Sequence, residues 1–145
     1  MTRQSKTIVF FGSGPVAASS LQLLSAQQVI TDVITKPSTL KEMTSVAPKT
    51  ARLHCVSNKT ELDTLIATLD CVEQIGIIID FGIIVSKKVI EAFESGIINS
   101  HFSLLPQWRG ADPISFAILS GQSKTGVTLM LLSEGLDEGM VLSIG

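Results

Sequence analysis

Short apolar runs rich in β-branched residues alternate with segments of helical spacing along the chain, and this alternation restricts its fold more than any other feature. The runs expected to form strands are 7–11, 29–35, 75–79, 96–98 and 125–132. The segments with helix-spaced apolar residues are 16–26, 59–69, 86–94 and 111–119. Because strands joined by helices through short connections form parallel sheets covered on both faces, the sequence predicts the α/β class: a doubly wound, mostly parallel, Rossmann-like sheet with flanking helices.

Three helix starts carry capping signals. Pro15 stands near the start of the first helical segment, where a missing amide costs nothing. Ser86 is expected to cap the third segment, and Asp112 to cap the fourth with Pro113 just inside it. These residues predict where the helices begin.

A polar pair follows the apolar run that ends at residue 98. Asn99 and His101 are two residues apart, so on a strand their side chains point to the same side. Open α/β sheets bind their ligands at the carboxyl ends of the strands. The pair is therefore the first place to expect a functional site.

Asp137 is the best-placed carboxylate to join this pair. It lies between Gly135 and Gly139, directly after the expected strand 125–132. Taken alone, it could be an ordinary turn residue. Together, an amide donor, an imidazole and a carboxylate suit the addition of a nucleophile to a carbonyl, because one group stabilises the oxyanion and another moves protons. None of the three is a serine, cysteine or lysine nucleophile, which favours direct transfer between two bound substrates.

The motifs around these residues resemble the methionyl-tRNA formyltransferase family. The matching features are Asn99-x-His101, Ser103-Leu-Leu-Pro106, Trp108-Arg-Gly-Ala111, Thr125-Gly-Val-Thr128 and Gly135-Leu-Asp137. The likeness runs from the first expected strand to the end of the chain and is strongest around the site. Asn-x-His and the late aspartate are shared by the wider formyltransferase superfamily. The neighbourhoods of Trp108 and Asp137 look more like the tRNA enzyme than the branches that act on purine precursors or sugar nucleotides.

The resemblance implies a role for each matching residue. Asn99 would donate a hydrogen bond to the formyl oxygen, His101 would be a second donor or a proton shuttle, and Asp137 would orient the imidazole or accept a proton through water. The positions that match the folate-binding segments are Phe81, Gly82, Ile83, Ile84, Ser103, Leu104, Leu105 and Pro106. The implied formyl donor is 10-formyltetrahydrofolate, and no metal is expected.

The acceptor side of the cleft is expected near Gly12, Ser13 and Arg109. Gly12-x-Gly14-Pro15 lacks the third glycine of a dinucleotide fingerprint, and Pro15 lacks an amide that a phosphate would use. We therefore expect this turn to bend the chain tightly and shape the cleft. Arg109 matches a family position whose role could also be structural.

The sequence departs from the family pattern at three points. Family members carry a glycine- and lysine-rich loop after the second strand that engages tRNA, whereas residues 36–43 contain no glycine and two lysines. Asp80 stands where a small residue is usual. The chain stops at Gly145 within an expected strand, so we expect residues 1–145 to be a single transferase-like domain that is incomplete at its C-terminus.

Composition limits the other classes of function. A net charge of −2, from 11 Lys and Arg against 13 Asp and Glu, does not favour broad phosphate binding by this chain. Two cysteines without CxxC spacing indicate a reducing compartment. No apolar stretch is long enough for a membrane span or a signal peptide, so we expect a cytoplasmic protein with no membrane contact.

Two single residues have a plainer interpretation. His54 is expected to be an ordinary packed or surface histidine. Trp108 is expected to pack beneath its loop rather than to stack on a base, because large aromatics usually serve as buried area.

The resulting hypothesis is formyl transfer from 10-formyltetrahydrofolate to the amino group of initiator methionyl-tRNA, with no covalent enzyme intermediate. The alternatives are transfer to a small amine, such as a purine precursor or an amino sugar, and a non-catalytic folate-binding module. A chain that is 45% hydrophobic with a mean hydropathy of +0.42 and ends beside its sheet is also expected to self-associate.

Overall fold

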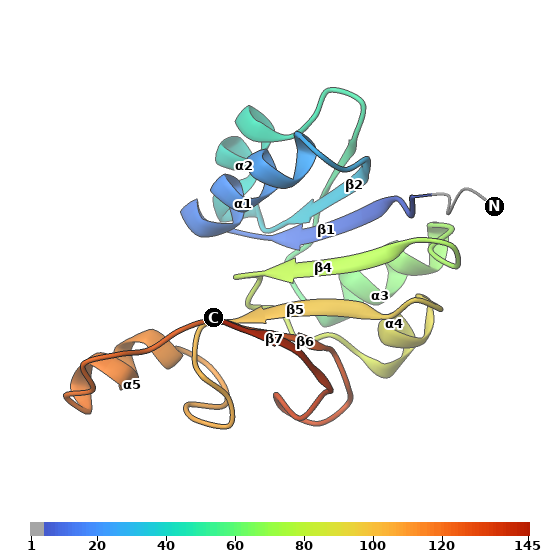
Figure 1. Ribbon diagram of the computed structural model, residues 1–145. Coiled ribbons are helices and arrows are strands. Elements are labelled where there is room, and N and C mark those ends of the chain that lie inside the picture. Colours follow the sequence, from blue (N-terminus) through green and yellow to red (C-terminus); the bar gives the residue numbers. More distant parts are fainter. Residues whose placement is uncertain (1–4) are drawn as a thin grey trace.

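A computed structural model describes residues 5–145 and contains one seven-stranded sheet in the order β3-β2-β1-β4-β5-β6-β7 (Figure 1). The strands are β1 Ile8–Gly12, β2 Ile30–Thr35, β3 Arg52–Cys55, β4 Ile75–Ile79, β5 Ile97–His101, β6 Thr128–Leu131 and β7 Val141–Ile144. The first five strands pair in parallel, and β6 and β7 extend the sheet in antiparallel pairing. The mostly parallel, doubly wound fold predicted from the sequence is confirmed.

The helices are α1 Pro15–Ser25, the 3-10 helix η1 Pro37–Thr39, α2 Leu40–Val46, α3 Lys59–Thr68, α4 Lys87–Glu91 and α5 Pro113–Leu119. Two buried cores show which helices cover which face. Leu21 of α1 and Met43 of α2 pack on Phe10 on one face, whereas Leu62 of α3 and Val89 of α4 lie in the cluster on the other face. Helix α5 lies beyond the carboxyl end of β5 (Figure 1).

The predicted caps are present. The Ser86 hydroxyl accepts a hydrogen bond from the amide of Val89 at 3.3 Å, and the Asp112 carboxylate accepts one from the amide of Ser115 at 3.3 Å. Pro15 and Pro113 are each in the first turn of their helix. Helix α4 is shorter than expected, because it ends at Glu91 rather than at residue 94.

Two elements differ from the expectation. Residues 36–43 form η1 and the first half of α2, and the buried side chain of Met43 anchors this segment to α1. Strand β3 was not expected, because Arg52-Leu-His-Cys55 has no clear strand pattern. It forms because its backbone pairs with β2 and its side chains meet a buried carboxylate.

That carboxylate belongs to Asp32. It is fully buried on β2 and accepts hydrogen bonds from Arg52 Nε at 2.9 Å and Nη2 at 3.0 Å, while His54 Nε2 lies 2.7 Å from its Oδ1. Burial acts to raise the pKa of Asp32, but the hydrogen bonds from Arg52, His54 and Thr31 outweigh it and lower that pKa below its usual value. His54 is thus a partly buried structural residue, as expected.

Two further findings concern the described chain as a whole. Among residues 5–145, no helix has the length and apolar character that crossing a bilayer requires. Cys55 is an exposed free thiol on β3, and burial is the main reason that the pKa of Cys71 rises to about 11.

Candidate active site

Strand β5 carries two of the three predicted catalytic residues to its carboxyl end. Asn99 and His101 alternate with Ser100 along the strand, so both project to the same face, as predicted. Strands β4 and β6 flank them, with Asn99 opposite Ile78 on one side and Met130 on the other. The site is thus one strand away from the point between β1 and β4 where the strand order reverses, where open α/β sheets bind ligands.

His101 is buried, and each ring nitrogen has a neighbour. Nε2 lies 2.9 Å from the carbonyl oxygen of Trp108, and Nδ1 lies 3.6 Å from Oδ1 of Asp137. Because a carbonyl oxygen can only accept, Nε2 carries the proton in this conformation. The distance at Nδ1 exceeds that of a normal hydrogen bond, so the carboxylate faces the ring without a close bond to it.

Asp137 is placed by the turn between β6 and β7. Its backbone is left-handed, with φ of 51°, and its Oδ2 accepts a hydrogen bond from the amide of Gly110 at 2.6 Å. Its side chain is about 10% exposed. The structure therefore brings Asp137 to His101 from another part of the chain, as the sequence predicted.

His101 and Asp137 both hold segment 108–110. The carbonyl oxygen of Trp108 accepts from His101, and the amide of Gly110 donates to Asp137. At the surface, Arg109 Nη1 lies 3.8 Å from Glu138 Oε1. Both partners of the Arg109 pair are about half exposed, so the pair adds little stability. The sequence did not predict this role of the backbone, because the residue type does not show which carbonyl or amide will form a hydrogen bond.

Trp108 packs as expected rather than standing free as a stacking platform. Its ring stacks on Phe116 of α5 with centroids 6.0 Å apart and planes 8° apart, and Nε1 donates to Gln122 Oε1 at 3.0 Å. The residue thereby fixes segment 108–110 against α5.

Asn99 is the member of the three whose polar group is available. Its side chain is half-buried, and within residues 5–145 its amide takes part in no hydrogen bond with the protein. An available amide donor beside an imidazole and a carboxylate can stabilise an oxyanion while the other two groups handle a proton.

We call residues 103–106 the donor loop, because we expect them, from the sequence, to bind the folate. Ser103 is buried and its hydroxyl donates to the carbonyl of Gln107 at 2.6 Å, which closes the loop on itself. The peptide bond between Leu105 and Pro106 is cis. Leu104 and Leu105 are half-buried and Pro106 is exposed, so the loop offers an apolar edge next to His101.

The segment 81–84 divides between core and surface. The Phe81 side chain is buried against Phe11, with ring centroids 5.8 Å apart, so only its backbone can reach a ligand. Gly82 has φ of 74°, Ile83 packs against the same core and Ile84 is 77% exposed. Of the four residues, Ile84 has the side chain that is most available.

Gly12 and Ser13 form the tight turn that was expected after β1. A β-carbon at Gly12 would lie 2.7 Å from the Ala17 side chain and 2.8 Å from the Ile79 carbonyl oxygen, so only glycine fits. Ser13 is buried, and its hydroxyl donates to the backbone oxygens of Asp80 at 2.9 Å and Phe81 at 3.2 Å. These contacts give Ser13 a structural task at the edge of the expected acceptor side.

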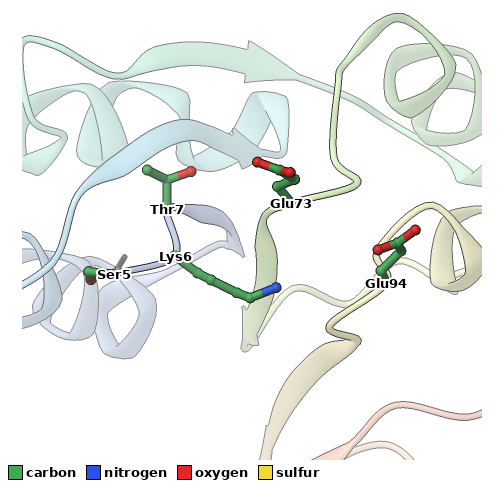
Figure 2. Close-up of a pocket in the computed structure, with 5 residues that line it drawn as sticks. All are labelled: Ser5, Lys6, Thr7, Glu73 and Glu94. Atoms are coloured by element: carbon green, nitrogen blue, oxygen red, sulfur yellow. The ribbon is translucent and has the colours of Figure 1, made fainter. Parts of the chain in front are cut away.

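A separate cavity of about 350 Å³ lies at the opposite end of the sheet. It is lined by residues that precede β1, β4 and β5: Ser5, Lys6, Thr7, Glu73 and Glu94. Figure 2 shows Lys6 extending toward the side where Glu73 and Glu94 lie. Because it is at the amino ends of the strands, this cavity is distinct from the candidate active site. Within residues 5–145, no group of three or more His, Cys, Asp or Glu residues is arranged to hold a metal ion.

Solved structures with this fold include several formyl-transfer proteins. Glycinamide ribonucleotide transformylase 1 from Geobacillus kaustophilus superposes with a TM-score of 0.80 at 22% identity, covering 98% of this chain and 82% of that protein. A formyltetrahydrofolate deformylase from Pseudomonas syringae pv. tomato gives a TM-score of 0.77 at 22% identity, covering 99% of this chain and 51% of that protein. At these identities the likeness establishes the fold.

Sequence comparison gives closer matches. A methionyl-tRNA formyltransferase from Thermodesulfovibrio yellowstonii is 36% identical over 95% of this chain, and one from Thiobacillus denitrificans is 35% identical over 94%. The chain spans about half the length of these relatives, 48% in each case. The profile of the family described as formyl transferase matches residues 5–144. Because this profile match extends over nearly the whole chain, the chain belongs to the formyl transferase family.

Proposed function

We propose that this chain takes part in the transfer of a formyl group from 10-formyltetrahydrofolate to the amino group of initiator methionyl-tRNA. The transfer is direct, with no covalent enzyme intermediate. Membership of the formyl transferase family supports the chemistry, and the names of the relatives at 35–36% identity support the acceptor. Because the chain spans about half of those relatives, both donor and acceptor are part of the proposal.

The observation that carries the proposal is the available Asn99 amide beside His101 and Asp137. Asn99 would donate to the formyl oxygen as negative charge develops on it. Asp137 would hold segment 108–110, whose Trp108 carbonyl orients the imidazole, and together with His101 it would remove the proton that the attacking amine loses. The donor loop and Ile84 would hold the folate, and Gly12, Ser13 and Arg109 would border the acceptor side.

Recognition of tRNA has weaker support within this chain. Residues 36–43 are folded into η1 and α2, and they supply only Lys36 and Lys41 as cations. The chain as a whole has a net charge of −2. Strong binding of a polyanion needs several cations, so the acceptor would need contacts beyond those that this segment supplies.

Transfer to a small amine is the second candidate. The observation in its favour is that several structural neighbours are phosphoribosylglycinamide formyltransferases, with TM-scores of 0.76 and 0.78 for those from Streptococcus pneumoniae and Bacillus halodurans. A non-catalytic folate-binding module would keep the donor side alone.

Calorimetry with a stable analogue of 10-formyltetrahydrofolate tests the donor side. We expect the wild-type chain to bind one equivalent. Ile84→Asp should weaken binding at least tenfold, because a charge would enter an apolar edge of the site, whereas Leu23→Asp on α1 should not change it. Leu23 is the matched control because it is 73% exposed, close to the 77% of Ile84. An absence of heat with the wild-type chain would overturn the donor assignment, and equal affinities of both variants would remove Ile84 from the site.

A rate comparison tests the acceptor. Formyl transfer to initiator methionyl-tRNA is compared with transfer to glycinamide ribonucleotide at equal concentrations. Faster transfer to the tRNA is expected. Faster transfer to the small amine would select the second candidate, and folate binding without either transfer would select the non-catalytic module.

A further inference from the structure

The motif Thr125-Gly126-Val127-Thr128 has no task in the chemistry described so far, yet it meets the donor loop at two points. We propose that Thr128 is a positioning residue that holds the donor loop in its folate-binding conformation, with Gly126 providing the space for that loop. The expected effect on folate affinity rests on the proposed function. The effect on the conformation of the donor loop can be tested without any ligand.

Thr128 is fully buried on β6, and its hydroxyl makes two hydrogen bonds to the donor loop. Oγ1 donates to the carbonyl oxygen of Ser103 at 2.7 Å and accepts from the amide of Leu105 at 3.1 Å. Among the described residues, these are the side-chain hydrogen bonds that tie the loop backbone to another element. One hydroxyl therefore fixes the backbone on both sides of Leu104.

Gly126 supports the same loop by its lack of a side chain. A β-carbon at this position would lie 2.5 Å from Cδ2 of Leu104 and 2.3 Å from the carbonyl oxygen of Gly145. Glycine at residue 126 therefore lets Leu104 settle directly on the backbone before β6, and a larger residue would force the Leu104 side chain to shift. Thr128 and Gly126 therefore contact adjacent residues of the donor loop: Thr128 contacts Ser103 and Leu105, and Gly126 contacts Leu104.

The strand register connects this anchor with the site. Thr128 lies opposite His101 in the antiparallel pair of β5 and β6. The loop that Thr128 holds begins two residues after His101, and Ser103 donates its amide to the His101 carbonyl at 2.9 Å. A fixed position of Thr128 thus sets the loop relative to the imidazole, and with it the folate relative to Asn99.

The cost of losing the hydroxyl follows from burial. Valine has nearly the shape of threonine, but it would leave the Ser103 carbonyl and the Leu105 amide without their partner. The loop would then spend part of its time in other conformations. Since the apparent dissociation constant rises in inverse proportion to the competent fraction, folate affinity would fall although no residue that contacts the folate has changed.

The test compares Thr128→Val with Thr128→Ser, which keeps the hydroxyl, and with Thr125→Val, the same change at an exposed position three residues earlier. Amide hydrogen exchange is measured at Leu105, with the amide of Phe10 in the buried core as a reporter of global unfolding. We expect Thr128→Val to speed exchange at Leu105 at least tenfold relative to Phe10. Thr128→Ser and Thr125→Val should stay within threefold of wild type.

The same variants are titrated with the folate analogue. Thr128→Val should bind at least tenfold more weakly than wild type, and Thr128→Ser should recover most of the affinity. Unchanged exchange at Leu105, or a loss of affinity that serine does not restore, would overturn the inference. If the wild-type chain binds no folate while Leu105 still responds to Thr128→Val, the proposed function fails and the anchor itself stands.

Discussion

At the scale of single residues, the site consists of side chains held by backbone groups. His101 and Asp137 do not form a close pair, because each directs its nearest hydrogen bond to segment 108–110. Asn99 is thereby the group whose hydrogen-bonding capacity remains for a ligand. Under the proposed function this difference gives separate tasks: Asn99 would act on the formyl oxygen, and Asp137 would hold segment 108–110, whose Trp108 carbonyl contacts the imidazole.

Those tasks predict different responses to substitution. In an assay of formyl transfer, Asn99→Ala and Asp137→Ala should each lower the rate about a hundredfold, the loss typical of one oxyanion donor or one acid-base group. Asn99→Ala should leave folate affinity within a few-fold, because its bond strengthens mainly in the transition state. Asp137→Ala also releases the Gly110 amide, so it should in addition speed hydrogen exchange there.

Ser100→Ala is the matched control, because Ser100 lies between the two site residues on β5 and points to the other face. It should keep wild-type activity. Wild-type rates for both Asn99→Ala and Asp137→Ala would remove these two residues from the chemistry.

Strand alternation is a local rule, and it was sufficient to predict that Asn99 and His101 share a face of β5. Asp137 follows β6, which is antiparallel to β5, so its place beside His101 was expected from the family resemblance rather than from a local rule. The sequence was not sufficient to predict the partners of these residues. The carbonyl of Trp108 and the amide of Gly110 exist at every position of the chain, and Phe81 was expected in the folate pocket although its ring is part of the core. Only the tertiary structure decides which backbone groups and which side of a strand face the site.

At the scale of elements, β3 is a strand that tertiary contacts stabilise, although its own residues do not predict a strand. Asp32 of β2 binds Arg52 and His54, which are two residues apart on β3 and so project to the same face. A buried carboxylate without these donors would be costly. Pairing with β3 therefore stabilises both strands at this edge of the sheet.

The contacts of Asp32 predict that the β2–β3 edge of the sheet loses stability in acid. The hydrogen bonds that Asp32 accepts lower its pKa in the folded chain below the ordinary value of 3.8. Its contribution to stability is therefore complete above pH 3.8 and is lost as the pH falls below that value, because the unfolded chain binds the proton first. Urea denaturation between pH 5 and about pH 2.5 measures the loss.

Asp32→Asn should be less stable than wild type at pH 5 but should lose less stability on acidification. Asp70→Asn, a change at an exposed aspartate, should retain the wild-type dependence on pH. A wild-type slope in Asp32→Asn would mean that other carboxylates cause the acid sensitivity.

The helices were easier to predict than β3, because their start signals are local. Ser86 and Asp112 mark the first residues of α4 and α5, and the structure confirms both caps. Helix α2 was missed although Thr39 and Glu42 have the spacing of a capping box, and in the structure the Thr39 side chain makes no hydrogen bond to the helix. What holds α2 is Met43 packed in the core with α1, which is a contact between distant parts of the chain.

At the scale of the whole molecule, apolar surface gathers at the β7 side of the sheet. Val141, Leu142 and Ile144 are each 46–53% exposed, and no charged residue or proline occurs between Gly139 and Gly145. Natural edge strands usually carry such residues, because an open row of backbone groups pairs with other strands. Helix α5 adds further exposed side chains, with Ile118 at 71% and Leu119 at 81%.

We therefore predict that the 145-residue chain forms a dimer through β7. Two copies related by a twofold axis would pair their β7 strands antiparallel, which continues the antiparallel pairing of β5, β6 and β7 and satisfies the open backbone groups of both. Light scattering over a dilution series should show a concentration-dependent dimer. Leu142→Lys should shift the equilibrium toward monomer at least tenfold, because it places a charge on the pairing strand, whereas Leu23→Lys on the exposed face of α1 should not. A monodisperse monomer at every concentration, or a Leu142→Lys variant that associates like wild type, would mean that the β7 edge does not hold the copies together.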